Sequence, residues 1–109
     1  MRSRSSRVLV QHPVSFTQEE GESGEGFLVN LSLSGCAVRD TSGVFVAEPM
    51  LVSLRIQPDP HSAPISIEMG KVRWAMNDQF GVEFLMVASK DRTRLQRLIR
   101  MATASSSAA

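Results

Sequence analysis

The chain is built from short segments in which apolar and polar residues alternate with a period of two, as is typical of half-buried β-strands. In segment 27–34 every odd position is apolar, and the even positions include Asn30 and Ser32. We therefore expect a strand with its odd positions in the core and with Asn30 and Ser32 together on the opposite face. The Ser-Gly pair that follows predicts a turn, and the sequence CAVRD after it predicts the partner strand of a tight hairpin.

Four other segments also have the pattern of strands: 7–17, 50–56, 65–76 and 79–87. Pro13 lies inside the first of them and indicates an edge position or a bulge, because proline cannot donate a ladder hydrogen bond. Residues 18–26 combine charge, serine and glycine without an apolar anchor, which predicts an exposed, mobile loop. Residues 57–64 contain three prolines and predict a second break in pairing.

The last two strands should form a second hairpin around the Asn-Asp pair at 77–78. Strict alternation puts Val72 and Trp74 on one face of that hairpin and Lys71 and Arg73 on the other. Between the two hairpins, three apolar residues of the 41–49 loop are expected to fold back over the core: Val44, Phe45 and Val46.

From Ser89 onward the apolar period changes to that of an amphipathic helix, with Leu95, Leu98, Ile99 and Ala102 forming one stripe. Ser89 suits the N-cap, and Asp91 suits the positive end of the helix dipole. The helix is expected over about 89–102, with 103–109 as a disordered tail. The fold class is thus all-β with one helix: a six-stranded antiparallel β-barrel over 8–102, closed by the C-terminal amphipathic helix and preceded by a flexible basic arm, 1–7.

Composition narrows the class of protein. A chain of 109 residues has room for one domain, and 42% apolar with 21% charged residues is the balance of a soluble globular protein. No apolar run approaches the ~20 residues that span a bilayer, and no signal-peptide pattern is present. We therefore expect no membrane insertion and a cytoplasmic location. Cys36 is the single cysteine, which excludes an internal disulfide and predicts a small buried core residue.

The net charge of +1 conceals an uneven distribution. The arm carries Arg2, Arg4 and Arg7 without an acid among them, while residues 19–25 contain four glutamates and 90–100 form a second basic block. A weak overall field with one local arginine cluster suits a small anion better than a long polyanion. We expect no binding of DNA or RNA.

The sequence lacks the parts of a catalytic or metal site, so we expect no enzyme activity, no cofactor and no metal. His12 precedes a proline on a predicted strand, and His61 lies in the proline-rich loop; neither has a second ligand at metal spacing. Cys36 has no base nearby, and no glycine-rich phosphate loop of the G-x-x-x-x-G-K-[ST] type occurs.

An RNA-binding small barrel would need exposed aromatic platforms on which bases stack. Only 6% of the residues are aromatic, and alternation predicts burial for most of them: Phe27, Phe80, Phe84 and Trp74. A place at the barrel rim is the alternative for Trp74, which is close to a strand end.

The arginine arm and the Asn30–Gly35 hairpin remain as candidate binding elements. Guanidinium groups suit phosphates and the O6/N7 edge of guanine, and an amide and a hydroxyl two residues apart can meet a base edge. Gly35 permits a positive φ or a close backbone approach. From the residues alone, the alternative stays open that Asn30 and Ser32 face water and Gly35 only turns the chain.

Several motifs in order resemble the PilZ domain, a bacterial receptor module for cyclic di-GMP: RVLVQHPV, NLSLSGCAV, GKVRW, QFGVEFL and the closing helix. The resemblance covers residues 4 to about 102. It implies that an N-terminal R-x-x-x-R loop and a [DN]-x-S-x-x-G motif bind the dinucleotide on a six-stranded barrel.

Asn30, Ser32 and Gly35 match the second motif in full. If Arg7 is the second arginine of the first motif, Ser3 stands where its first arginine is expected, with Arg4 one residue too close and Arg2 one too far. The resemblance thus implies a cyclic di-GMP site made by Arg4, Arg7, Asn30, Ser32 and Gly35. Arg2 and Arg73 are additional candidates, although a solvent-facing role is favoured for Arg73.

The function that the resemblance implies is a cyclic di-GMP receptor and adaptor in second-messenger signalling, motility or biofilm formation. Ligand binding would order the arm and signal by contact with an unidentified protein effector, and the chain would be a monomer or a weak homodimer. The displaced arginine motivates an alternative: a degenerate PilZ domain that binds no nucleotide and acts as a protein-interaction adaptor in pilus or flagellar motility.

Overall fold

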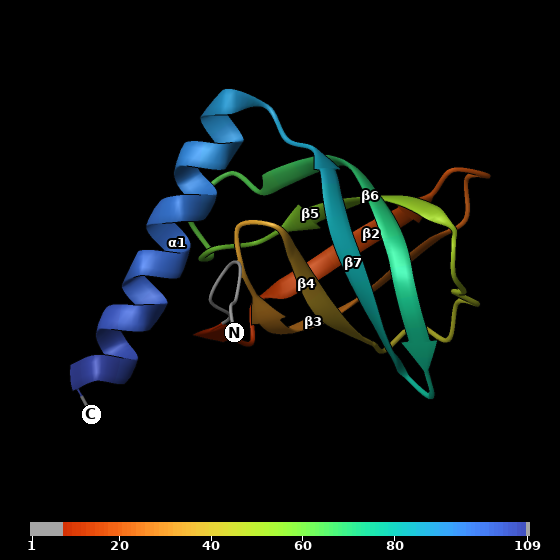
Figure 1. The fold of residues 1–109 in the computed structure, drawn as a ribbon, viewed down its shortest axis with the longest axis horizontal. Coiled ribbons are helices and arrows are strands. Elements are labelled where there is room, and N and C mark those ends of the chain that lie inside the picture. Colours follow the sequence, from red (N-terminus) through yellow and green to blue (C-terminus); the bar gives the residue numbers. More distant parts are fainter. Residues whose placement is uncertain (1–7, 109) are drawn as a thin grey trace, which may run out of the picture.

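The structure, a computed structural model that describes residues 8–108, is a closed β-barrel with one helix beside it (Figure 1). Its elements are β1 (Val8–Leu9), β2 (Pro13–Gln18), β3 (Ser23–Leu31), β4 (Gly35–Asp40), β5 (Leu51–Ile56), β6 (Ile65–Met76), β7 (Gln79–Met86) and α1 (Ser89–Ala108). Neighbours around the barrel are β3-β2-β5-β6-β7-β4, all antiparallel, and β4 pairs back with β3 to close it. The expected six-stranded antiparallel barrel with a C-terminal helix is confirmed.

The first predicted strand is divided in two. β1 pairs with the end of β3, opposite Leu31 and Asn30, and β2 pairs with the earlier part of the same strand. Pro13 is the first residue of β2, a position at which a missing N–H is tolerated. The short strand β1 therefore holds the beginning of the described chain against the Asn-x-Ser segment.

The predicted loop 18–26 is too long, because β3 already begins at Ser23. Gly24 and Gly26 belong to this strand, where a side chain on Gly26 would collide with the Arg39 carbonyl oxygen of β4. Gly26 thus permits close approach of β3 and β4, and Gly24 leaves room for the Phe16 and Ser42 side chains. The remaining acidic turn lies at the end of the barrel remote from α1 (Figure 1).

Two register shifts alter the predicted faces. In β3 the pairing with β4 shifts between Leu28 and Asn30, so that Leu28 is buried and Phe27 is 46% exposed. In β6 the pairing with β7 shifts between Val72 and Trp74, so that Val72 is buried and Trp74 is 43% exposed. The burial predicted for Phe27 and Trp74 is wrong, because an extra residue in one strand reverses the alternation beyond it.

The barrel core contains the inward residues of all six long strands, and Phe16 and Phe80 meet in it edge to face with ring centroids 5.0 Å apart. Cys36 is buried there as predicted. Val44 and Val46 pack against the core from the 41–49 loop, as expected, but Phe45 is exposed.

Helix α1 covers one end of the barrel through the predicted stripe, with Leu95 and Leu98 buried. The Asp91 carboxylate accepts the Ser66 backbone N–H of β6 at 3.3 Å, which joins the first turn to the barrel. Ala88 accepts the first helical hydrogen bond, from Arg92, so Ser89 is the first helical residue rather than the N-cap. The helix continues to Ala108, past the end predicted near residue 102, because 103–108 contain no glycine or proline to end it.

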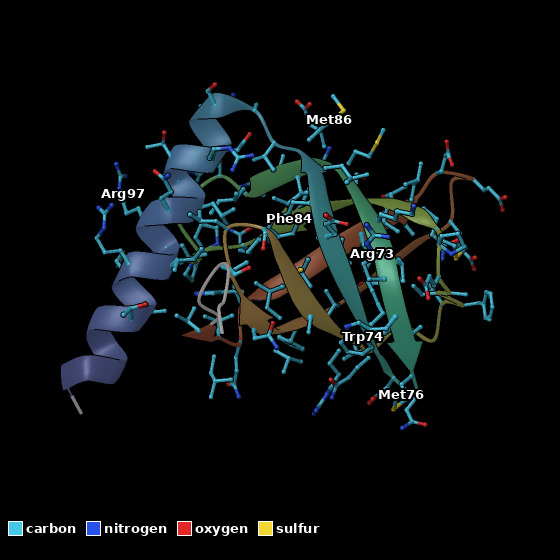
Figure 2. All side chains as sticks on the ribbon, viewed as in Figure 1. Arg73, Trp74, Met76, Phe84, Met86 and Arg97 are labelled. Atoms are coloured by element: carbon cyan, nitrogen blue, oxygen red, sulfur yellow. The ribbon has the colours of Figure 1, made fainter. Side chains whose placement is uncertain are left out.

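The apolar face of α1 faces the barrel, and basic residues occupy much of its outer surface; Figure 2 shows Arg97 pointing away from the strands. No helix among the described residues is long and apolar enough to cross a membrane.

Candidate functional site

The outer face of β3, β4, β7 and β6 carries Asn30 at one side and Trp74 at the other. The strand register makes one row of Asn30, Ala37, Gly81 and Trp74, each paired with the next. Ala37 lies between Cys36 and Val38, whose side chains are in the core, so this row points outward. Two very small residues, both buried, therefore lie between an amide and an indole ring.

Trp74 lies over Gly81. A side chain on Gly81 would collide with the indole Nε1 and Cε2 atoms, so the ring rests directly against the backbone of β7. Figure 2 shows Arg73, Trp74 and Met76 in succession along β6 toward the hairpin tip. An exposed aromatic face can pack on a flat heterocycle, while an amide hydrogen-bonds its edge. This row suits the binding of a planar polar ring.

Trp74 was not a site residue in the sequence prediction, although a signal for it exists. Pairs counted back from the Asn-Asp turn at 77–78 run 76–79, 75–80 and 74–81, which already places the tryptophan opposite a glycine. An aromatic ring across from a strand glycine commonly covers it on the outer face.

Ser32 does not share an exposed face with Asn30, contrary to the prediction. Its side chain is 1% exposed and lies inside the turn between β3 and β4. The Ser32 hydroxyl oxygen accepts the backbone N–H groups of Ser34 and Gly35, each at 3.2 Å, and lies 3.2 Å from the Gly35 carbonyl oxygen, to which it donates. After the register shift, the pairing of β3 with β4 ends at Leu31 and Cys36. Ser32 is therefore the first residue of the turn, where its side chain is drawn inward. Ser32 is thus a structural element of the hairpin.

We expect Ser32→Ala to lower the free energy of unfolding by about 1–3 kcal/mol, the cost of leaving buried N–H groups without their acceptor. Urea denaturation followed by circular dichroism measures this. Ser34→Ala is the matched control, because its hydroxyl is exposed and contacts only the Ser32 hydroxyl, at 3.3 Å; its effect should stay within ~0.5 kcal/mol. Equal stability of the two variants would contradict the structural role of Ser32.

Gly35 is the first residue of β4 and pairs with Glu83 of β7. A side chain at this position would collide with the Val82 carbonyl oxygen, and the φ of Gly35 is not positive. Of the two reasons that the sequence offers for a glycine here, close backbone approach is therefore the one that applies. The approaching group is strand β7.

Arg73 is exposed, in line with the solvent-facing role that the sequence favours, and it is also ion-paired. Its Nε donates to Glu83 Oε1 at 2.6 Å, and its Nη2 contacts the same oxygen. A ligand anion would have to compete with that carboxylate for the guanidinium group.

The other predicted arginines, Arg2, Arg4 and Arg7, lie outside the described residues. Val8, which follows Arg7, pairs with Leu31, and Leu9 pairs with Asn30. The point at which the arm joins the barrel is thus beside the Asn-x-Ser segment.

The two histidines belong to neither the row nor a metal site. His12 contributes its carbonyl to the Leu28 N–H, and the His61 N–H donates to the Asp59 carboxylate. Hydrogen bonds from the Ser62 hydroxyl and this N–H lower the pKa of the exposed Asp59 carboxyl. Within the part of the chain that the structure covers, no group of three or more His, Cys, Asp or Glu residues could hold a metal ion.

Three solved structures resemble this fold. The PilZ domain of CeSA from a cellulose-synthesizing bacterium is 20% identical, with 87% of this chain and 95% of that chain covered and a TM-score of 0.69. The PilZ domain of YcgR from Escherichia coli, solved with c-di-GMP, is 14% identical, with 97% and 95% covered and a TM-score of 0.70. The Bacillus subtilis inhibitor of motility, MotI/DgrA, is 24% identical with a TM-score of 0.73; 93% of this chain covers 51% of that one.

A search of curated proteins finds no match. The sequence does match the PilZ domain family over residues 1–101, nearly its whole length. PilZ domains are binding and adaptor domains rather than enzymes. Together with the closed barrel and the N-x-S-x-x-G turn, this match shows that the chain belongs to the PilZ domain family of cyclic di-GMP receptors.

Proposed function

We propose that this domain binds cyclic di-GMP, without converting it, on the outer face of β3, β4, β7 and β6. Arg7 and Arg4, with Arg2 as a substitute for Arg4, bind the phosphates and guanine edges, and Asn30 hydrogen-bonds a guanine. Ser32 and Gly35 hold the turn that positions Asn30, and the Trp74 ring contacts a guanine face.

One observation carries this proposal: β1 joins the arm to the motif. Val8 and Leu9 pair with Leu31 and Asn30, so the described chain begins next to the amide that would recognise the base. The register row from Asn30 through Ala37 and Gly81 to Trp74 puts an amide and an exposed indole ring on the same outer face. The proposal therefore combines arginines that directly precede β1 in the sequence with an amide and an indole ring on the barrel face.

The signal would then pass by contact. Closure of the arm over the ligand combines the two into a new surface, which a protein effector can bind. Since cyclic di-GMP is a bacterial cytoplasmic messenger, we place the domain in the cytoplasm, in motility or biofilm control.

Isothermal titration calorimetry with cyclic di-GMP, GTP and a short single-stranded RNA tests the ligand class. We expect saturable heat only with cyclic di-GMP at tens of micromolar protein. No heat with any of the three would contradict nucleotide binding. It would promote the second candidate function, a protein-interaction adaptor in pilus or flagellar motility, which the exposed Leu9 (82%) and Met76 on the same outer surface favour. Heat with RNA would support the alternative that the domain is an RNA-binding barrel, which the sequence disfavours.

A further inference from the structure

A hollow of about 820 Å³ lies on the outer surface beside Asn30, and the motif does not account for it. It is lined by residues of β1, β3 and β4, among them Leu9, Phe27, Val29 and Arg39. Its volume is within the range of small-molecule sites, ~300–1,000 Å³. Three of these side chains are apolar and one is a cation.

Arg39 is held in place by its strand. Its backbone pairs with Phe27 on one side and Gln79 on the other, and Gly26 leaves no side chain between β3 and β4 at this point. Arg39 is two residues from Ala37 on the same face, a separation of about 7 Å along a strand. Its guanidinium group is therefore within reach of a ligand that lies on the outer face beside Asn30.

The charge of Arg39 is not neutralised by an ion pair with another described residue. Arg73, on the far side of the same face, is paired with Glu83. The carboxylate next to Arg39 along the chain, Asp40, accepts the backbone N–H and the hydroxyl of Ser42, at 2.8 and 2.6 Å. On strands β3 and β4, Arg39 is the cation that remains available to an anion.

The Phe27 ring lies in the register position next to Arg39 and is 46% exposed, and Leu9 on β1 is 82% exposed. When a flat ring packs against large apolar side chains that are this exposed, their surface is removed from water, and this stabilises the contact. A guanidinium group beside an aromatic ring is a combination that binds a phosphate together with its base.

We propose that Arg39 and Phe27 extend the cyclic di-GMP site into this hollow, with Arg39 bound to a phosphodiester oxygen and Phe27 against a guanine ring. This inference rests on the proposed function. It also gives the displaced arginine a physical replacement: the guanidinium group that Ser3 lacks is supplied from β4. Because a barrel strand already fixes the Arg39 backbone, this contact orders fewer residues on binding than a contact from the arm.

Calorimetric titration of the whole chain with cyclic di-GMP tests the proposal through Arg39→Gln and Phe27→Ala. We expect Arg39→Gln to raise Kd about tenfold or more, and Phe27→Ala about fivefold or more. Arg92→Gln is the matched control: Arg92 is an exposed arginine near the start of α1, away from the β3–β4 face, and its Kd should stay within about twofold of the unmodified chain. The Kd of Arg39→Lys should lie between those of the unmodified chain and Arg39→Gln, because lysine keeps the charge and loses the planar fork of donors.

Salt dependence separates an ionic contact from a structural effect. Loss of a phosphate contact flattens the fall of affinity with salt, so the slope for Arg39→Gln should be shallower than that for Arg92→Gln. If the unmodified chain binds and Arg39→Gln binds equally well with the same salt slope, the inference is wrong while the proposed function holds. If the unmodified chain does not bind cyclic di-GMP, both fail.

Discussion

Gly35→Ala is expected to lower the free energy of unfolding by about 3 kcal/mol or more, the largest effect on stability among the motif positions. The added methyl group would meet the Val82 carbonyl oxygen of β7. That carbonyl belongs to the backbone of a barrel strand and cannot rotate away as a side chain would. Relief requires β4 and β7 to separate where Gly35 pairs with Glu83.

Urea denaturation measures this effect, and Gly43→Ala is the control. Gly43 has a positive φ of 79° but open space around its α-carbon, so alanine there costs only backbone strain, about 1–2 kcal/mol. If Gly35→Ala kept full stability and lost only cyclic di-GMP binding, the glycine would act on the ligand and not on the barrel.

Arg7→Ala is expected to weaken cyclic di-GMP binding by at least an order of magnitude without a change in thermal stability. The loss corresponds to one charge-assisted contact of ~1.5–3 kcal/mol. Arg7 immediately precedes Val8, whose pairing with Leu31 fixes the chain beside the motif. Among the arm arginines it therefore has the shortest path to the ligand. Calorimetric titration gives the affinity, and a thermal melt monitored by circular dichroism gives the stability.

Arg4→Ala should lower the affinity for cyclic di-GMP less than Arg7→Ala does, because Arg2 can take the place of Arg4 on the ligand. The double variant Arg2→Ala/Arg4→Ala should lose nearly as much affinity for cyclic di-GMP as Arg7→Ala. Equal losses for the three single variants would contradict this order.

Period-two patterning was sufficient to predict the barrel strands, because one buried face per strand leaves a direct trace in the sequence, and the change to a helical period predicted the closing helix. It failed where the chain gains a residue within a strand. The shifts at Leu28/Asn30 and Val72/Trp74 exchange the inner and outer faces, and alternation alone carries no sign of them. Gly24 and Gly26 were misread as loop because the approach of β4, which explains Gly26, arises only in the closed barrel.

The candidate site was predicted in part. The resemblance pointed to Asn30, Ser32 and Gly35 as a set, and the structure brings them together in one hairpin. The resemblance could not separate the roles of these residues, since the burial of Ser32 follows from a turn that starts after the register shift. Arg39 and Phe27, which we propose to extend the site, were not candidates in the sequence, because strict alternation assigned Phe27 to the core and Arg39 lies beyond the motif.

The hydrogen bonds of Ser32 and the contact of Gly35 have a consequence for how such domains evolve. Both residues support the barrel itself, so natural selection for folding retains them whether or not the domain still responds to its messenger. The arginines proposed to bind the ligand act on affinity, so their retention would depend on selection for binding. An intact N-x-S-x-x-G sequence is therefore a poor indicator of a responsive receptor, and the basic residues around it are the better one.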